Sequence, residues 1–204
     1  EIQKIIMKYI ITGFLLFLSV SLFSQEDTKN NYEKKEVYIE MRDGTKLFTA
    51  IYTPKDISAD INYPILMQRT CYSIAPYGED NFKKSLGPNV FLQKDKYIYV
   101  YQDVRGRYMS EGVFTNMTPQ VAHKTKKDID ESTDTYDTID WLVKNIKNNN
   151  GKVGQYGTSY PGFYAAVGTL ANHSALVASS PQAPISDFFF DDFHHNGAFL
   201  MSSF

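Results

Sequence analysis

The sequence predicts an α/β fold, with a doubly wound, mostly parallel sheet that begins with antiparallel strands. From residue 62 onward, short apolar segments alternate with helical segments, the order that builds a parallel sheet covered by helices. An alternating segment around Asp43-Gly44 precedes them and is typical of an antiparallel hairpin. The chain has 204 residues, 43% of them hydrophobic, which suits one domain, or a piece of a larger one, with an ordinary core.

The first four strands are expected before residue 108. Residues 36–54, EVYIEMRDGTKLFTAIYTP, hold two β-rich runs that flank a turn and predict the hairpin. Residues 62–72, NYPILMQRTCY, and residues 95–107, DKYIYVYQDVRGR, are short apolar runs that predict buried strands. The second of these ends in a polar loop, where we expect Arg105 to pair with Asp103 and to support the site without taking part in chemistry.

The second half of the chain predicts helix, strand, helix and strand. A helix is expected over residues 131–146, with acidic residues in its first turns and apolar side chains at helical spacing, namely Tyr136, Ile139, Val143 and Ile146. A strand over residues 152–157, KVGQYG, leads directly to a second helix over residues 161–173, whose proline lies near the start. A last short strand is expected over residues 175–184.

The N-terminal segment has the pattern of a secretory signal peptide. Met7 is a better start than residue 1, and a short basic region and the apolar run 10–23 follow it. That run is shorter than the roughly 20 residues of a spanning helix, which favours a cleaved signal over residues 1–25 rather than a membrane anchor. We therefore expect a periplasmic or secreted protein without a stable membrane anchor. Its one cysteine, Cys71, provides no internal disulfide.

The charge distribution argues against a nucleic-acid partner. The formal net charge is -2, and the chain contains no long basic run. Lysines in the segment 124–127 lie beside acidic residues and indicate a solvated loop.

The segment 154–162, GQYGTSYPG, holds a candidate nucleophile. Ser159 follows a predicted strand and precedes a predicted helix, the context of the nucleophile elbow G-x-S-x-G. The match is imperfect, because Pro161 stands where the second glycine is expected and Gly162 comes one residue later. The alternative is a polar residue in a tight turn. The first N–H groups of the helix and its dipole would favour a developing oxyanion beside this serine.

A serine nucleophile needs a general base, which the sequence does not clearly provide. In this kind of fold the chain order is Ser, then Asp or Glu, then His. His173 is expected near a helix end, as a cap or facing solvent, and His194 and His195 follow too few strands. We therefore expect the triad Asp and His beyond residue 204, with residues 188–204 beginning a helical cap and the chain truncated there.

Several segments together resemble the α-amino-acid ester hydrolases, which belong with cocaine esterases, glutaryl acylases and Xaa-Pro dipeptidyl peptidases in one group of α/β hydrolases. The segments cover residues 35–204 in family order: RTCY, QDVRGRYMSEGVF, DESTDTYDTIDWLVKN, GKVGQYGTSYPGFYA and DDFHHNGAF. The elbow of this group is G-x-S-Y-x-G, so the late Gly162 is a family trait. The resemblance implies that residues 26–187 are the N-terminal part of an α/β-hydrolase domain.

The resemblance also implies an activity and an oxyanion hole. The reaction would be hydrolysis or transfer of acyl groups from α-amino-acid esters or related amides, without a cofactor. Ser159 would form the acyl-enzyme, and the Tyr160 backbone N–H and the Tyr72 hydroxyl would hold the oxyanion. Cys71 stands where relatives usually have proline. The alternative for Tyr72 is a core aromatic with a hydrogen-bonded hydroxyl.

Asp191 and Asp192 are candidates for binding a substrate ammonium group. In the ester hydrolases one member of such an acidic cluster comes from this segment, and Asp192 is the first choice. The alternative is that both residues cap a helix over FHHNGAFLM, because Asp is a favoured N-cap. A metal site with His194 and His195 matches no strong spacing template, so no metal is expected.

The residues are consistent with three functions. The first is an acylase or esterase, the second an Xaa-Pro dipeptidyl peptidase, and the third an incomplete, inactive fragment. The expected partner is a small-molecule ester or amide, and a homo-oligomer is possible.

Overall fold

The computed structural model describes residues 28–56, 61–122, 124–187, 189–195 and 197–199. The expected signal segment 1–25 therefore lies outside the described residues, as does 200–204. The elements are β1 (Tyr32–Glu40), β2 (Lys46–Pro54), β3 (Tyr63–Thr70), α2 (Val90–Lys94), β4 (Ile98–Asp103), α3 (Glu131–Asn145), β5 (Asn149–Thr158), α4 (Tyr160–Thr169), β6 (Leu176–Gln182), η1 (Phe189–Phe193), β7 (His194–His195) and β8 (Ala198–Phe199). In the part of the chain that is described, no helix has the length and hydropathy needed to cross a bilayer.

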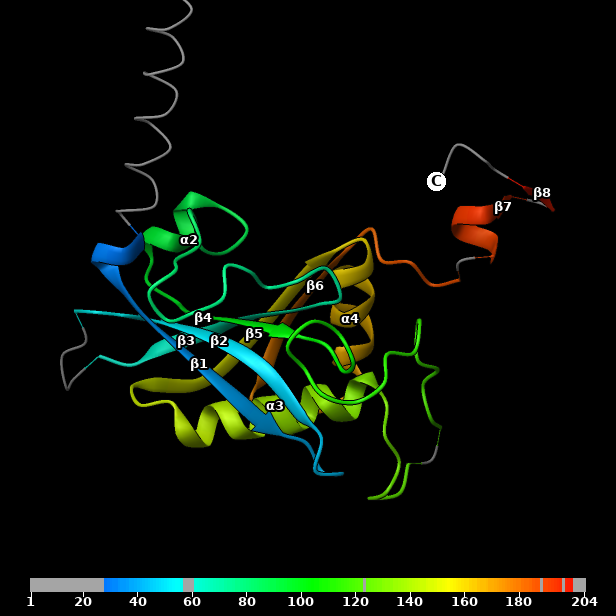
Figure 1. Cartoon of the computed structure of the whole chain (residues 1–204), viewed down its shortest axis with the longest axis horizontal. Helices are drawn as coiled ribbons and strands as arrows, with labels where there is room; N and C mark the ends of the chain where they lie inside the picture. The colour runs from blue at the N-terminus through cyan, green and yellow to red at the C-terminus, as the bar shows by residue number, and fades with distance from the viewer. Residues whose placement is uncertain (1–27, 57–60, 123, 188, 196, 200–204) are drawn as a thin grey trace, which may run out of the picture.

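Six strands form one mixed sheet in the order β1-β2-β4-β3-β5-β6. The pairs β1–β2 and β2–β4 are antiparallel, and β3–β4, β3–β5 and β5–β6 are parallel. The predicted α/β-hydrolase arrangement, with antiparallel strands first and a parallel sheet after them, is confirmed. Figure 1 shows α3 and α2 on opposite sides of this sheet.

Alternation along the strands divides the core between the two faces of the sheet. On β4, Ile98 and Val100 pack in a cluster with Ile139 and Leu142 of α3. Tyr99 belongs to a second, aromatic cluster that the segment between β3 and β4 covers on the opposite face. Successive side chains of a strand point to opposite faces, so this single strand contributes to both cores.

The chain changes direction across the sheet between β3 and β5. From β3 it passes to β4 on one side, and it then returns to β5 on the other side of β3. The segment after β3 leads to α2, whereas the turn after β5 leads to α4, which packs beside α3 on the other face. Ligands of open α/β sheets bind at such a switch point, outside the carboxyl ends of the strands.

Several element boundaries differ from the prediction. Helix α2, which has five residues and is capped by the Asn89 side chain, was not predicted. Strand β5 begins at Asn149 rather than residue 152, and α4 ends at Thr169 rather than residue 173. The alternative helix over FHHNGAFLM is not formed, because His194–His195 and Ala198–Phe199 pair as a small antiparallel ladder.

A buried ion cluster joins α3 to the sheet. Arg69 of β3, with 2% of its side chain exposed, lies 3.2 Å from the Glu131 carboxylate and donates to the Thr135 hydroxyl. Asp134 lies 3.7 Å from Arg69 and 2.7 Å from Arg105. Burial raises the pKa of Glu131 and the positive charge of Arg69 opposes that rise.

Arg105 is ion-paired as predicted, but its partner is different. It bridges Asp134 and Asp43, each at 2.7 Å, and thereby ties α3 to the turn between β1 and β2. Asp103, the expected partner, instead accepts hydrogen bonds from Ile74 N–H and the Tyr77 hydroxyl. The sequence pointed to the nearest acidic residue, whereas the tertiary fold brings two distant ones closer.

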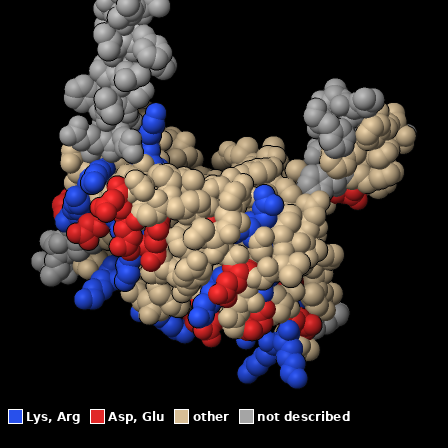
Figure 2. Space-filling view, viewed as in Figure 1, with Lys and Arg blue, Asp and Glu red and all other residues tan. Residues whose placement is uncertain are grey.

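Figure 2 shows that acidic and basic side chains are interspersed on the visible face. This face carries no continuous basic surface of the kind that binds nucleic acid.

The ion cluster predicts that two arginine substitutions lower the free energy of unfolding by very different amounts. Arg69→Met should lower the free energy of unfolding by about 3–5 kcal/mol, because Glu131 would lose its ion-pair partner and remain as a buried charge, whereas Asp134 keeps its pair with Arg105. Arg42→Ala, which removes a more exposed pair with Asp137, should cost about 1 kcal/mol or less. Urea unfolding of both variants measures the difference.

The loss in free energy of unfolding caused by Arg69→Met should also become smaller as the pH falls. Protonation removes the cost of a buried charge, and burial already favours the protonated form of Glu131. Equal losses for both variants, or a pH-independent loss for Arg69→Met, would contradict the structural role of this cluster.

Candidate active site

Ser159 occupies a strained turn between β5 and α4. Its backbone has φ 63° and ψ −122°, in a region that non-glycine residues rarely adopt. Its N–H donates to the Gln182 carbonyl of β6, and its carbonyl accepts from Phe163 N–H, both at 3.0 Å. The serine is exposed, so this backbone geometry presents its side chain outside the carboxyl end of the strand.

Two glycines make this turn possible. A Cβ at Gly157 would lie 2.1 Å from the Pro161 carbonyl oxygen, closer than atoms can approach. A Cβ at Gly162 would lie 2.5 Å from the Gln182 carbonyl oxygen. The glycine at position 162 therefore lets α4 approach the end of β6, which gives the late glycine of this motif a physical reason.

Tyr160 is the first residue of α4 and is anchored by its side chain. Its hydroxyl donates to the Asn116 side-chain oxygen at 2.6 Å and accepts from Met117 N–H at 2.7 Å. Its ring is buried in a cluster with Cys71 and Phe163. The backbone N–H groups of a helix's first turn point toward its N-terminal end, so those of α4 lie on the side of Ser159, where donors can stabilise an oxyanion.

Tyr72 lies beside this turn. Strands β3 and β5 are paired at Met67 and Gln155, and Tyr72 and Ser159 follow their respective carboxyl ends. The Tyr72 ring meets the Tyr160 ring edge-on, with 6.2 Å between the centroids. With 58% of its surface exposed, Tyr72 is not the core aromatic that was its alternative. The structure thus brings together three of the predicted site residues.

Cys71 is buried next to Tyr72. It packs against Val104 and the Tyr160 ring, and burial raises the pKa of its thiol. Its carbonyl accepts from Arg107 Nε at 3.0 Å. This cysteine is therefore a packing residue, and its thiol is poorly suited to act as a nucleophile.

The side chains of the two remaining predicted site residues are not described, and two of the histidines lie in other surroundings. Asp191 and Asp192 belong to the backbone of η1, but their side chains lie outside the described part of the structure. His173 follows the far end of α4, with its Nε2 3.7 Å from Asp140 and its ring 4.7 Å from that of Tyr136. His194 stacks on Phe189 at 4.3 Å. In the described segments, no three metal-ligating side chains gather.

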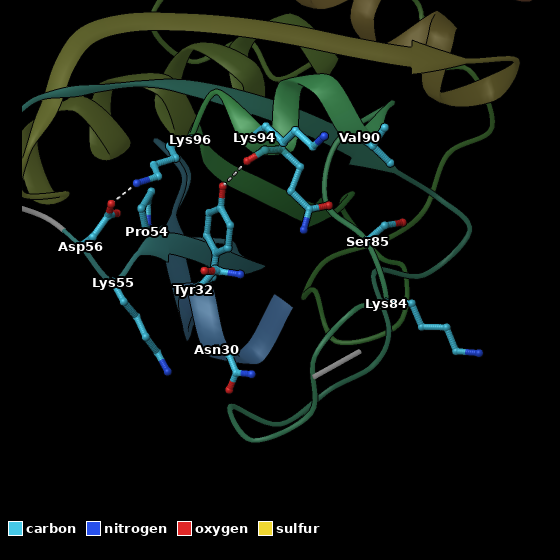
Figure 3. Close-up of a pocket in the computed structure, with 12 residues that line it drawn as sticks. Asn30, Tyr32, Pro54, Lys55, Asp56, Lys84, Ser85, Val90, Lys94 and Lys96 are labelled. Atoms are coloured by element: carbon cyan, nitrogen blue, oxygen red, sulfur yellow. Dashed lines mark hydrogen bonds and ion pairs between the residues drawn. The ribbon is translucent and has the colours of Figure 1, made fainter. Parts of the chain in front are cut away.

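A cavity of about 580 Å³ lies elsewhere, at the opposite edge of the sheet. Residues that line it include Tyr32 at the start of β1 and Lys96 just before β4. Figure 3 shows Lys55 and Lys84 pointing in different directions and Lys96 paired with Asp56. The ammonium groups do not converge, so the cavity is not built for an anion, and it is not part of the Ser159 site.

Sequence reasoning missed the residues that hold this site together. Gln182, Asn116 and Asp103 contact the turn or the loop of Tyr72 from distant parts of the chain. Asp103 and Gln182 are the last residues of β4 and β6, and the sequence indicates Asp103 only as a partner of Arg105.

The family of the chain follows from a comparison with known proteins. Residues 43–204 match the model of the X-Pro dipeptidyl-peptidase (S15) family. The chain belongs to this family. The resemblance to the group of cocaine esterases and α-amino-acid ester hydrolases is thereby confirmed.

Individual known proteins are also similar to this chain in sequence and in structure. The cocaine esterase of Rhodococcus sp. (strain MB1 Bresler) is 32% identical over 155 residues, which cover 73% of this chain and 24% of the esterase. A solved α-amino acid ester hydrolase is 41% identical with a TM-score of 0.72, covering 85% of this chain and 29% of that one. An aminopeptidase of Thaumarchaeota archaeon is 40% identical with a TM-score of 0.73, covering 83% of this chain and 28% of that one. The chain thus spans about a quarter of the length of the curated relatives.

The close contacts at Gly157 predict that a methyl group added there destabilises the protein more than one added at Gly154. Gly157→Ala should lower the free energy of unfolding by about 1–3 kcal/mol, because the turn must open to admit a Cβ. Gly154→Ala, on the same strand, should cost less, because its Cβ would lie 3.4 Å from Leu66 Cδ1, an ordinary contact. Thermal unfolding of the two variants checks this, and equal stability would show that the close approach at Gly157 is unimportant.

Proposed function

We propose that the protein is a serine hydrolase that cleaves α-amino-acid esters or related amides through an acyl-enzyme on Ser159. One observation carries this proposal: the only serine of the chain in a G-x-S turn adopts a left-handed backbone conformation at the switch point of the sheet. Unlike Ser73, which also has a positive φ, Ser159 is exposed and lies directly between the end of β5 and the first turn of α4. A nucleophile gains exposure and nearby helix N–H groups.

The proposed mechanism assigns each site group one role. Ser159 Oγ attacks the substrate carbonyl carbon, and a His base, expected beyond residue 204, takes the hydroxyl proton. The Tyr160 backbone N–H and the Tyr72 hydroxyl donate hydrogen bonds to the developing oxyanion. The leaving alcohol or amine takes the proton from the base, and water then cleaves the acyl-enzyme by the same route.

Recognition of a substrate α-ammonium group is assigned to Asp192, with Asp191 as the alternative. The names of two solved relatives, an α-amino acid ester hydrolase and an aminopeptidase, support a substrate with an amino group next to the reacting carbonyl. We also propose export to the periplasm or medium, which the signal pattern of residues 1–25 supports.

Substitution of the nucleophile tests the proposal directly. In the natural full-length protein, Ser159→Ala should lower kcat for a phenylglycine ester by about 10⁶-fold, the loss seen when a serine nucleophile is removed. Ser180→Ala, on neighbouring β6, is the matched control and should leave kcat unchanged. Steady-state kinetics measures both, and retained activity in Ser159→Ala would refute the proposed nucleophile.

The choice of substrate separates this proposal from an Xaa-Pro dipeptidyl peptidase, which the family description favours. The proposal predicts a higher kcat/KM for glycine or phenylglycine esters than for a Gly-Pro anilide. Both substrates carry a free amino group, so the comparison isolates the acyl and leaving groups. A preference for the anilide would replace the esterase assignment with the peptidase while leaving Ser159 as the nucleophile.

A further inference from the structure

The loop that carries Tyr72 is held by the segment that follows β4. Val104 N–H donates to the Thr70 carbonyl at 3.0 Å, and Arg107 Nε donates to the Cys71 carbonyl at 3.0 Å. On the other side of Tyr72, Ile74 N–H donates to Asp103 Oδ1 at 3.0 Å. Hydrogen bonds to backbone groups on both sides of Tyr72 therefore hold the loop that carries this exposed tyrosine.

Asp103 is the central group of this arrangement. It is fully buried at the end of β4. Its second oxygen accepts from the Tyr77 hydroxyl at 2.9 Å, and that hydroxyl lies 2.9 Å from Ser73 Oγ. Ser73, the residue after Tyr72, has a φ of 86°, a conformation that needs such support.

We propose that Asp103, acting with Tyr77, is a positioning residue that sets the Tyr72 hydroxyl at the oxyanion of the proposed reaction. The inference rests on the proposed function. Asp103 touches neither Ser159 nor its turn in the described contacts, so its effect must pass through the Tyr72 loop. Burial raises the pKa of this carboxyl, and its hydrogen bonds with Tyr77, Ile74 and Met109 oppose that rise.

Two variants remove this support to different degrees. Asp103→Ala leaves Ile74 N–H and the Tyr77 hydroxyl without their acceptor, and Tyr77→Phe removes only the link to Asp103 and Ser73. Asp103→Asn is the conservative variant, because its amide can accept from Ile74 N–H and donate to the Tyr77 oxygen after the hydroxyl rotates. Tyr99→Phe is the matched control, since the buried Tyr99 hydroxyl has no hydrogen-bond partner among the described residues.

The experiment measures kcat and KM for a phenylglycine ester in the natural full-length protein, with and without Tyr72→Phe. Asp103→Ala should lower kcat by about 10- to 100-fold with little change in KM, as expected when a catalytic group is misplaced. Tyr77→Phe should act in the same direction, and Asp103→Asn and Tyr99→Phe should keep most of the activity. In the Tyr72→Phe background, Asp103→Ala and Tyr77→Phe should change kcat by less than about twofold, because the group they position is gone.

Equal losses of kcat with and without the Tyr72 hydroxyl would overturn the inference, since they would show a general effect on the fold. If Asp103→Ala does not fold, the same comparison with Tyr77→Phe decides. An inactive Ser159→Ala together with an unimpaired Tyr72→Phe would refute the role of this loop but leave the nucleophile in place. An active Ser159→Ala would instead refute the proposed function.

Discussion

The close approach of the Ser159 turn to β6 is the constraint on which the candidate site depends. Gly162 is the point of contact with β6, where a side chain would collide with the Gln182 carbonyl oxygen, and Gly157 lets the start of α4 fold back over the end of β5, where a side chain would collide with the Pro161 carbonyl oxygen. The bond from Ser159 N–H to the Gln182 carbonyl fixes the strained serine against the same strand. Strain of about 1–3 kcal/mol at one residue persists only when its surroundings hold it, and here the neighbouring strand and helix do so.

The sheet topology then determines which segments of the chain lie beside Ser159. The chain leaves β3 and β5 toward opposite faces, and Tyr72 and Ser159 follow the carboxyl ends of these two neighbouring strands, the position at which open α/β sheets bind ligands. The buried cluster of Arg69, Glu131 and Asp134 ties α3 to β3, and α3 in turn packs against α4. The ion cluster and the turn therefore belong to one rigid frame that carries the loops of the site.

Much of this arrangement could be predicted from the sequence, because the information was local. Alternation predicted the hairpin, short apolar runs predicted β3 and β4, helical spacing predicted α3, and the order of the elements predicted the parallel sheet. The G-x-S turn identified Ser159, and the family resemblance identified Tyr72. Long-range polar contacts could not be predicted: Arg105 prefers Asp43 and Asp134 to its sequence neighbour Asp103, and α2 is too short to leave a periodic pattern.

The most direct test of the account is to identify the residue that reacts covalently. The natural full-length protein would be treated with a fluorophosphonate, and the modified peptide would be sequenced by mass spectrometry. The account predicts a single adduct on Ser159, in the peptide that contains GQYGTSYPG. An adduct on another residue, or none in a preparation that hydrolyses the ester, would show that the strained turn does not carry the nucleophile.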